Sequence, residues 1–186
     1  MEDNNTNLSD MSVSAFEALT DKSEVNILLE FVKPSMELKT MKGEVTMPSK
    51  PEMVDYTLKE VIFFKNCFKE SEIDAVLEKM YNAEDFSNYS IFSLTSVVKW
   101  VTEQMTAIIK NEERISSSKD KELWKAAGIE RMGGFGEYVG LYMLTQDITK
   151  EDQVLSMPYY RIFDYMEISK VWGEVQGAFQ KLKSKQ

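Results

Sequence analysis

Histidine is missing from this chain of 186 residues, and cysteine occurs once, as Cys67. The lack of histidine excludes Ser-His-Asp and Cys-His nucleophile activation, imidazole metal ligands and histidine acid–base catalysis. A single cysteine excludes an internal disulfide, and its neighbours in "FFKNCFKE" predict a buried, unreactive thiol. An enzyme would therefore depend on carboxylates, Lys, Tyr or backbone amides. Because no pair of carboxylates stands out, we predict no catalytic residue, no cofactor and no metal.

Positive charge is also scarce: 22 Lys and Arg stand against 31 Asp and Glu, for a net charge of -9. This balance argues against nucleic-acid binding, which needs clustered Lys and Arg, and against docking on anionic membranes. A basic protein partner is compatible with it. The chain has neither a positively charged start with an apolar run nor about 18 consecutive apolar residues, so we expect no secretory signal and no membrane span. We expect a cytoplasmic protein.

Glycine is infrequent, and four of the eight glycines lie in "RMGGFGEYVG". A dinucleotide-binding loop needs a glycine three positions after Gly136, where Val139 stands, and no glycine precedes the Lys-Ser/Thr pair of a phosphate-binding P-loop. Two pairs of glycines are instead spaced four apart, which places each pair on one helix face. We predict close helix packing at Gly136, Gly140, Gly173 and Gly177.

The patterns that are present predict a mainly α fold: a compact bundle of about six helices with a small N-terminal β-hairpin and a flexible N-terminal leader. Residues 1–22 are polar and acidic, and we interpret them as the leader, in which "SVSAFEAL" is compatible with a short helix. Residues 23–186 are then a single helical domain, with a β-hairpin over 25–47 that turns near Gly43 and a helical bundle over 55–183.

Within the bundle, "TLKE" from Thr57 to Glu60 has the form of a capping box, which marks a helix start. Apolar residues at helical spacing follow from Ser71 and again over 90–114. The last helix is expected from Pro158 to about Lys183. Its predicted apolar stripe consists of Ile162, Met166, Trp172, Val175, Phe179 and Leu182.

The start of this last helix, "MPYYRIFDYME", carries apolar and aromatic residues around most of its circumference. One interpretation is a helix in the centre of the fold. The other is a groove for a protein partner, because Met and Tyr are frequent contact residues. On that hypothesis the partner contacts are Tyr159, Tyr160, Arg161, Phe163 and Tyr165.

The segment "FGEYVGLYMLTQDITKEDQVLSMPYYRIFDYMEISKVWGEVQGAFQ" is similar in layout to the helical core of phage tail assembly chaperones. A helix ending in Leu144 and Thr145 is followed by a short acidic connection, a few apolar residues and an aromatic-rich helix. The resemblance covers about a quarter of the chain and leaves the N-terminal hairpin unexplained. It implies a small acidic protein that coats the hydrophobic tape-measure helix until the tail tube polymerises.

Three functional hypotheses follow. The first is a non-catalytic assembly chaperone or adaptor whose partner is a helical, apolar or basic protein. The second is a structural subunit of a larger viral particle, buried against copies of itself. The third is a carboxylate-based enzyme. Self-association is compatible with the first two, and neither nucleic acid nor membrane is an expected partner.

Overall fold

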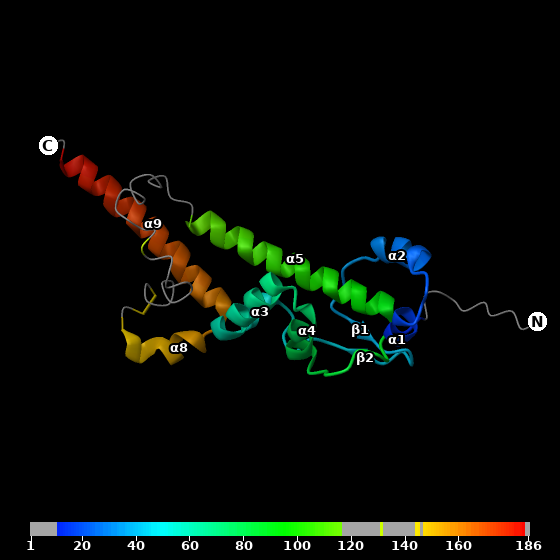
Figure 1. The fold of residues 1–186 in the computed structure, drawn as a ribbon. Coiled ribbons are helices and arrows are strands. Elements are labelled where there is room, and N and C mark those ends of the chain that lie inside the picture. Colours follow the sequence, from blue (N-terminus) through cyan, green and yellow to red (C-terminus); the bar gives the residue numbers. More distant parts are fainter. Residues whose placement is uncertain (1–10, 117–130, 132–143, 146, 185–186) are drawn as a thin grey trace, which may run out of the picture. The chain divides into compact units, whose positions relative to one another are not determined.

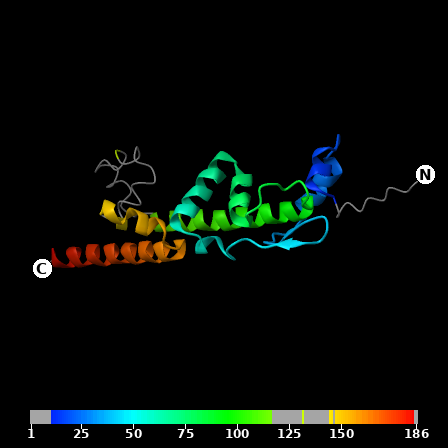
Figure 2. The same cartoon turned by 90° about the horizontal axis from the view of Figure 1, so that it is seen from below.

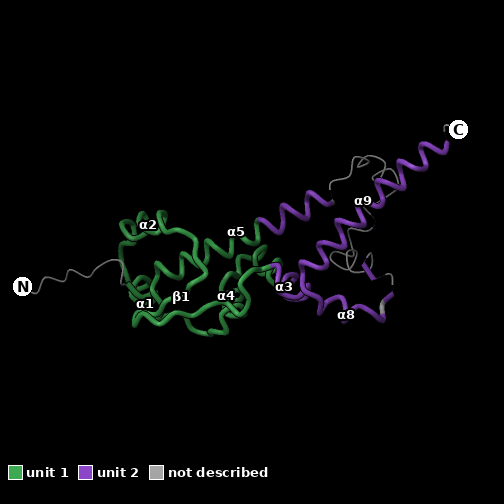
Figure 3. The backbone as a smooth tube through the Cα atoms, turned by 180° about the vertical axis from the view of Figure 1, so that it is seen from behind, with its two compact units in different colours: residues 1–53, 63–106 green, residues 54–62, 107–186 purple. Residues whose placement is uncertain are grey.

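The chain is mainly α-helical, as its sequence predicts (Figure 1). The structure is a computed structural model that describes residues 11–116, 131, 144–145 and 147–184. Two compact units make up the chain, where the sequence predicted one helical domain (Figure 3). The first unit holds residues 1–53 and 63–106, and the second holds 54–62 and 107–186. Each unit has buried side chains of its own, so each is described by itself.

The first unit begins with two short helices, α1 (Val13–Glu17) and α2 (Ser23–Glu30). Ser12 starts α1, because its hydroxyl accepts a hydrogen bond from the Ala15 amide at 3.1 Å. Met11, Val25 and Ile91 form a small apolar cluster with the partly buried side chains around them. The short helix that "SVSAFEAL" suggested is therefore present as α1. The prediction of a flexible leader is wrong for residues 11–19, whose apolar side chains pack in this cluster, and residues 1–10 lie outside the described chain.

The predicted β-hairpin is confirmed only in its second half. Strands β1 (Leu38–Lys39) and β2 (Val45–Thr46) pair antiparallel, and Gly43 at φ 83° takes the left-handed conformation that the turn requires. The apolar run before them, predicted as strand, is helix α2. A distant side chain supports this helix: the Lys99 ammonium donates to the carbonyls of Leu29, Glu30 and Val32 at 2.8–2.9 Å.

The predicted capping box is confirmed at the start of α3 (Leu58–Glu70). The Glu60 amide donates to the Thr57 hydroxyl at 3.3 Å, and the Thr57 amide donates to the Glu60 carboxylate at 2.9 Å. Helix α4 (Ile73–Tyr81) buries the apolar face that its sequence predicts, with Val76, Leu77 and Met80 fully covered. The short helix η2 (Met53–Asp55) precedes α3.

Helix α5 (Ile91–Ser116) is the longest in the described chain, and it starts within one residue of the predicted position. Its first part belongs to the first unit, where α4 and the hairpin lie on different sides of it (Figure 2). Val97, Val101 and Met105 have no exposed surface, so the predicted apolar stripe of this helix is a core stripe.

The second unit contains the short helices η4 (Ile148–Lys150) and α8 (Glu151–Leu155) and the long helix α9 (Tyr159–Lys183). Its buried side chains are Tyr56, Leu58, Val61, Ile108, Tyr159 and Ile162. Residues 117–130 and 132–143, which include most of the helix expected to end at Leu144 and Thr145, lie outside the described residues.

Candidate protein-docking surface

Helix α9 begins where the sequence predicts, directly after Pro158. Pro158 has an extended backbone (φ -56°, ψ 138°), and the chain on either side of it is tied to the segment before α3. The Leu58 amide donates to the Met157 carbonyl at 2.9 Å, and the Tyr159 amide donates to the Tyr56 carbonyl at 2.8 Å. These two backbone bonds fix the first turn of α9 within the second unit.

One face of the first two turns of α9 is covered, and we call it the inner face. Its members are Tyr159, Ile162, Phe163 and Met166, of which the first two are buried and the others half-buried. The Tyr159 hydroxyl donates to the Glu112 carboxylate at 2.6 Å. Burial first, and then this carboxylate, raise the pKa of the Tyr159 phenol far above its usual range. Tyr159 is therefore a neutral hydrogen-bond donor that holds α9 to the end of α5.

Polar contacts continue this attachment for one further turn. Arg114 forms an ion pair with Glu167, and the Lys170 ammonium donates to the Arg114 carbonyl at 2.7 Å. Lys170 thereby satisfies a carbonyl near the C-terminus of α5, where a cation is also favoured by the helix dipole. After Lys170, every described residue of α9 is exposed.

The other side of α9 carries an apolar face that the described chain leaves uncovered, and we call it the outer stripe. Its members are Tyr165, Ile168, Trp172, Val175, Phe179 and Leu182. Each has more than half of its surface exposed, from 52% for Tyr165 and Val175 to 68% for Ile168. Isolated exposed apolar residues are ordinary, but a continuous row of six is typical of interaction surfaces, so the outer stripe is a candidate docking surface.

The two apolar faces of α9 point in opposite directions. Ile168 follows Tyr159 by nine residues, which is two and a half turns of an α-helix, so their side chains point to opposite sides. The sequence predicted one stripe that joined Ile162 and Met166 to Trp172 and the residues after it. That prediction is wrong, because Ile162 is buried on the inner face while Trp172 is 60% exposed on the outer stripe.

The five predicted partner contacts are spread around α9 and form no single patch. Tyr159 is 2% exposed, so it is a core residue and is not available to a partner, which corrects the prediction. Phe163 is half-buried, whereas Tyr160, Arg161 and Tyr165 are exposed. Of the five, only Tyr165 belongs to the outer stripe. Sequence analysis missed the stripe as a site, although its alternating spacing of three and four residues was the available signal.

A small cavity lies beside the first turns of α9, next to Tyr160, Phe163 and Asp164. Val54 and Ile108 also line it, and its volume is about 100 Å³. Small-molecule sites usually measure about 300–1,000 Å³. The cavity is thus too small for an ordinary ligand, and the surface near it offers a protein contact at most.

Of the four glycines predicted to pack, the structure describes Gly173 and Gly177. A Cβ atom added at either position would meet no atom within 4 Å, and both lie on a fully exposed part of α9. Gly136 and Gly140, the other half of the predicted contact, lie outside the described residues, so the close packing of the two pairs stays a prediction.

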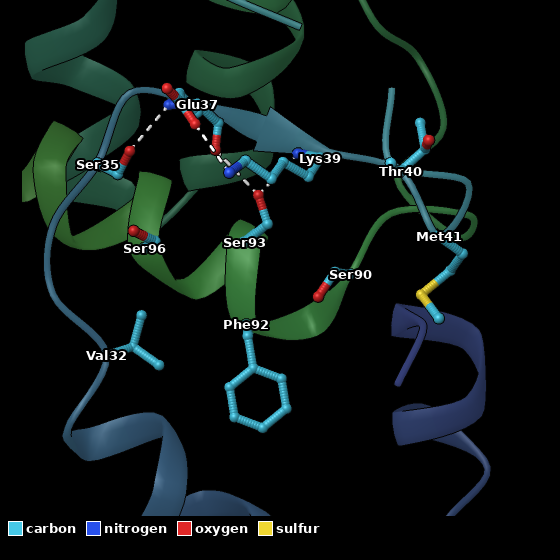
Figure 4. A pocket seen from close by; sticks show the side chains of 11 residues that line it. Val32, Ser35, Glu37, Lys39, Thr40, Met41, Ser90, Phe92, Ser93 and Ser96 are labelled. Carbon is cyan, nitrogen blue, oxygen red and sulfur yellow. Dashed lines mark hydrogen bonds and ion pairs between the residues drawn. The ribbon is translucent and has the colours of Figure 1, made fainter. Parts of the chain in front are cut away.

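A larger cavity, of about 420 Å³, lies in the first unit between strand β1 and the start of α5 (Figure 4). Its polar groups hold these two elements together. The Ser93 hydroxyl accepts from the Lys39 amide at 2.7 Å and donates to the Glu37 carbonyl at 2.9 Å. The Ser96 hydroxyl donates to the Lys33 carbonyl, and the Ser35 hydroxyl accepts from the Glu37 amide. The serines therefore serve the fold, and no side chain here is arranged as a base that would activate one of them.

Cys67 is buried, as its apolar neighbours predict. Burial, and secondarily the charges of Glu72 and Glu70, raise the pKa of its thiol and so disfavour the reactive thiolate. Over the part of the chain that the structure describes, no three Cys, Asp or Glu side chains gather as metal ligands.

Comparison with known proteins adds no relative. No protein-family model, no curated protein and no solved structure matches this chain. None of the helices described here has the length and apolar character needed to cross a membrane.

Proposed function

We propose that this chain is a non-catalytic protein-binding protein that docks an apolar helix along the outer stripe of α9. The observation that carries the proposal is the row of six large apolar side chains, each more than half exposed. Their spacing matches the seam by which two helices pack, and laying an apolar helix face against another is a recurrent mode of recognition.

The attachment of α9 supports the same function. Its first turns are held by backbone hydrogen bonds, by the Tyr159–Glu112 hydrogen bond and by the contacts of Arg114. The last turns extend from this anchored base with polar residues on the side opposite the outer stripe. A helix presented in this way is ready for a partner, because little of its backbone remains to be ordered on binding.

The resemblance to phage tail assembly chaperones gives such a surface a specific use. In that proposal the outer stripe shields an apolar helical partner, such as a tape-measure protein, until assembly. The acidic net charge of -9 would favour a partner with basic residues beside its apolar face. A structural subunit of a viral particle is the second candidate, since a permanently seated neighbour would cover the same stripe.

A synthetic helix tests the docking function directly. The probe is a fluorescein-labelled peptide of four heptads with Leu at the two seam positions and Lys beside them, and its anisotropy reports binding. Val175→Glu places a charge in the outer stripe, whereas Gln180→Glu adds the same charge on the opposite exposed side. We expect Val175→Glu to weaken binding at least tenfold and Gln180→Glu to leave it within twofold. Equal weakening by both variants, or no binding by the unaltered protein, would overturn the proposal.

A further inference from the structure

The outer stripe has the spacing of a coiled-coil seam. From Tyr165 to Leu182 its members are separated by three, four, three, four and three residues. This alternation keeps six side chains on one line along the helix and makes two positions of every heptad apolar. Val171 and Ala178 lie on one flank of the line, and Ser169 and Gln176 lie on the other. A seam of this kind fits a helix with the same spacing, and α9 itself is such a helix.

The stripe is also complementary to itself when two copies run antiparallel. With the two-fold axis beside Gly173 and Glu174, each seam side chain of one copy lies opposite a seam side chain of the other. The facing pairs are Tyr165 with Leu182, Ile168 with Phe179, and Trp172 with Val175. All six side chains are covered in this register, and each aromatic ring faces an aliphatic side chain, so large and small residues alternate along the interface.

The helix dipoles favour the antiparallel direction. The overall charge distribution adds a weaker preference in the same sense. Asp164 and Glu167 lie near the start of the stripe, whereas Lys181 and Lys183 lie at its end, so an antiparallel pair brings the basic end of one copy to the acidic end of the other. Glu167 and Lys181 lie on the side of α9 away from the seam, so we expect no ion pair between them across the interface.

The area of the stripe is enough for a weak dimer. A fully covered aromatic side chain buries 150–250 Å², so the exposed parts of the three aromatic residues represent roughly 100 Å² each. The aliphatic members contribute about 60 Å² each by the same reasoning. With the flanking residues, two copies would bury on the order of 1,000 Å², which is the lower limit for a specific interface. Because buried area alone does not set affinity, we expect a weak dimer.

From the spacing, the self-complementary register and the area of the stripe, we infer that a second copy of this chain occupies the outer stripe as an antiparallel helix pair. The inference rests on the proposed function, because it names the partner of the same docking surface. The inner face stays attached to its own unit, since it points away from the seam. In an assembly chaperone, this self-association would protect the stripe until a tighter-binding helix displaces the second copy.

Sedimentation of the full chain between 1 and 200 µM tests the inference. We expect the unaltered protein to pass from monomer to dimer over this range. Val175→Glu should raise the dissociation constant at least tenfold, and Gln180→Glu should leave it within twofold. A monomer at every concentration would overturn the inference, and so would a dimer that Val175→Glu leaves intact. If the protein stays monomeric but binds the heptad peptide, the inference of a second copy fails and the proposed function stands. If the protein neither dimerises nor binds the peptide, the proposed function fails as well.

Engineered cysteines test the direction in a Cys67→Ala background. In the antiparallel register Ser169 of one copy lies near Gln176 of the other, whereas the two Lys183 residues are about 28 Å apart at 1.5 Å per residue. We expect a mixture of Ser169→Cys and Gln176→Cys proteins to form the mixed disulfide, and Lys183→Cys alone to form none. A rapid Lys183→Cys disulfide would indicate a parallel pair and overturn the antiparallel assignment.

Discussion

Helices α5 and α9 are nearly equal in length, 26 and 25 residues, and both carry apolar residues at helical spacing. Their environments differ completely. Val97, Val101 and Met105 of α5 have no exposed surface, while every member of the outer stripe of α9 is more than half exposed. Periodicity therefore identifies an amphipathic helix but does not determine whether its apolar side is covered by the same chain or by another.

The reason lies in the number of apolar faces that each helix carries. The buried residues of α5 continue along one side, so one set of neighbours covers them. Helix α9 has an inner face over its first turns and the outer stripe on the opposite side. The described chain covers α9 on one side only, so the second apolar face stays exposed, and this is the face on which we propose that a partner docks.

Truncation of one large side chain in each helix gives the largest expected contrast. Met105→Ala removes a fully buried side chain from α5 and should lower the free energy of unfolding by about 2–5 kcal/mol. Phe179→Ala removes a side chain that is 62% exposed and should change it by less than about 0.5 kcal/mol. Urea unfolding followed by circular dichroism, at protein concentrations below 1 µM, measures both. Similar losses of unfolding free energy in the two variants would show that the outer stripe is part of a buried core.

A smaller effect on stability is expected from removing the hydroxyl groups of two neighbouring tyrosines on α9, Tyr159 and Tyr160. Tyr159→Phe deletes the hydrogen bond to Glu112 and should cost about 1.5–3 kcal/mol at neutral pH, because the acceptor is a carboxylate. Tyr160→Phe makes the same chemical change on an exposed side chain and should cost less than about 0.5 kcal/mol. Urea unfolding at pH 7 compares the two.

The stabilising effect of the Tyr159 hydroxyl depends on pH. The pKa of Tyr159 is raised in the folded protein, so its contribution is fully present below the unfolded phenol pKa of about 10 and is lost as pH rises above it. The stability advantage of the unaltered protein over Tyr159→Phe should therefore shrink between pH 9 and pH 11. An advantage that stays constant over this range would contradict the role given to the phenol.

Local signals in the sequence predicted local structure well. The capping box at Thr57 and Glu60, the turn at Gly43 and the covered face of α4 depend on residues a few positions apart, and all are confirmed. The same holds for the burial of Cys67, whose neighbours are apolar.

Features that depend on distant residues could not be predicted. Helix α2 is a short apolar run that fits strand or helix equally, and its C-terminus is satisfied by Lys99, about 70 residues away. The candidate site shows the same limit. Tyr159 and Tyr160 are adjacent and chemically identical, so only the position of α5 assigns one to the core and the other to the surface. The spacing of the outer stripe was readable, but its exposure was not.

The smallest expected effect concerns Gly177, on the side of α9 away from the outer stripe. Gly177 lies in a fully exposed part of α9, and a Cβ atom there would meet nothing within 4 Å. Gly177→Ala should therefore stabilise the helix by up to about 1 kcal/mol, since alanine loses less backbone entropy than glycine. Because the end of α9 can unfold without the rest, amide hydrogen exchange over 171–183 is the measurement that resolves the change. Slower exchange is expected both in the monomer and in the dimer, because Gly177 points away from the seam. Faster exchange would mean that a neighbour packs closely against this face, as the predicted packing of the glycine pairs requires.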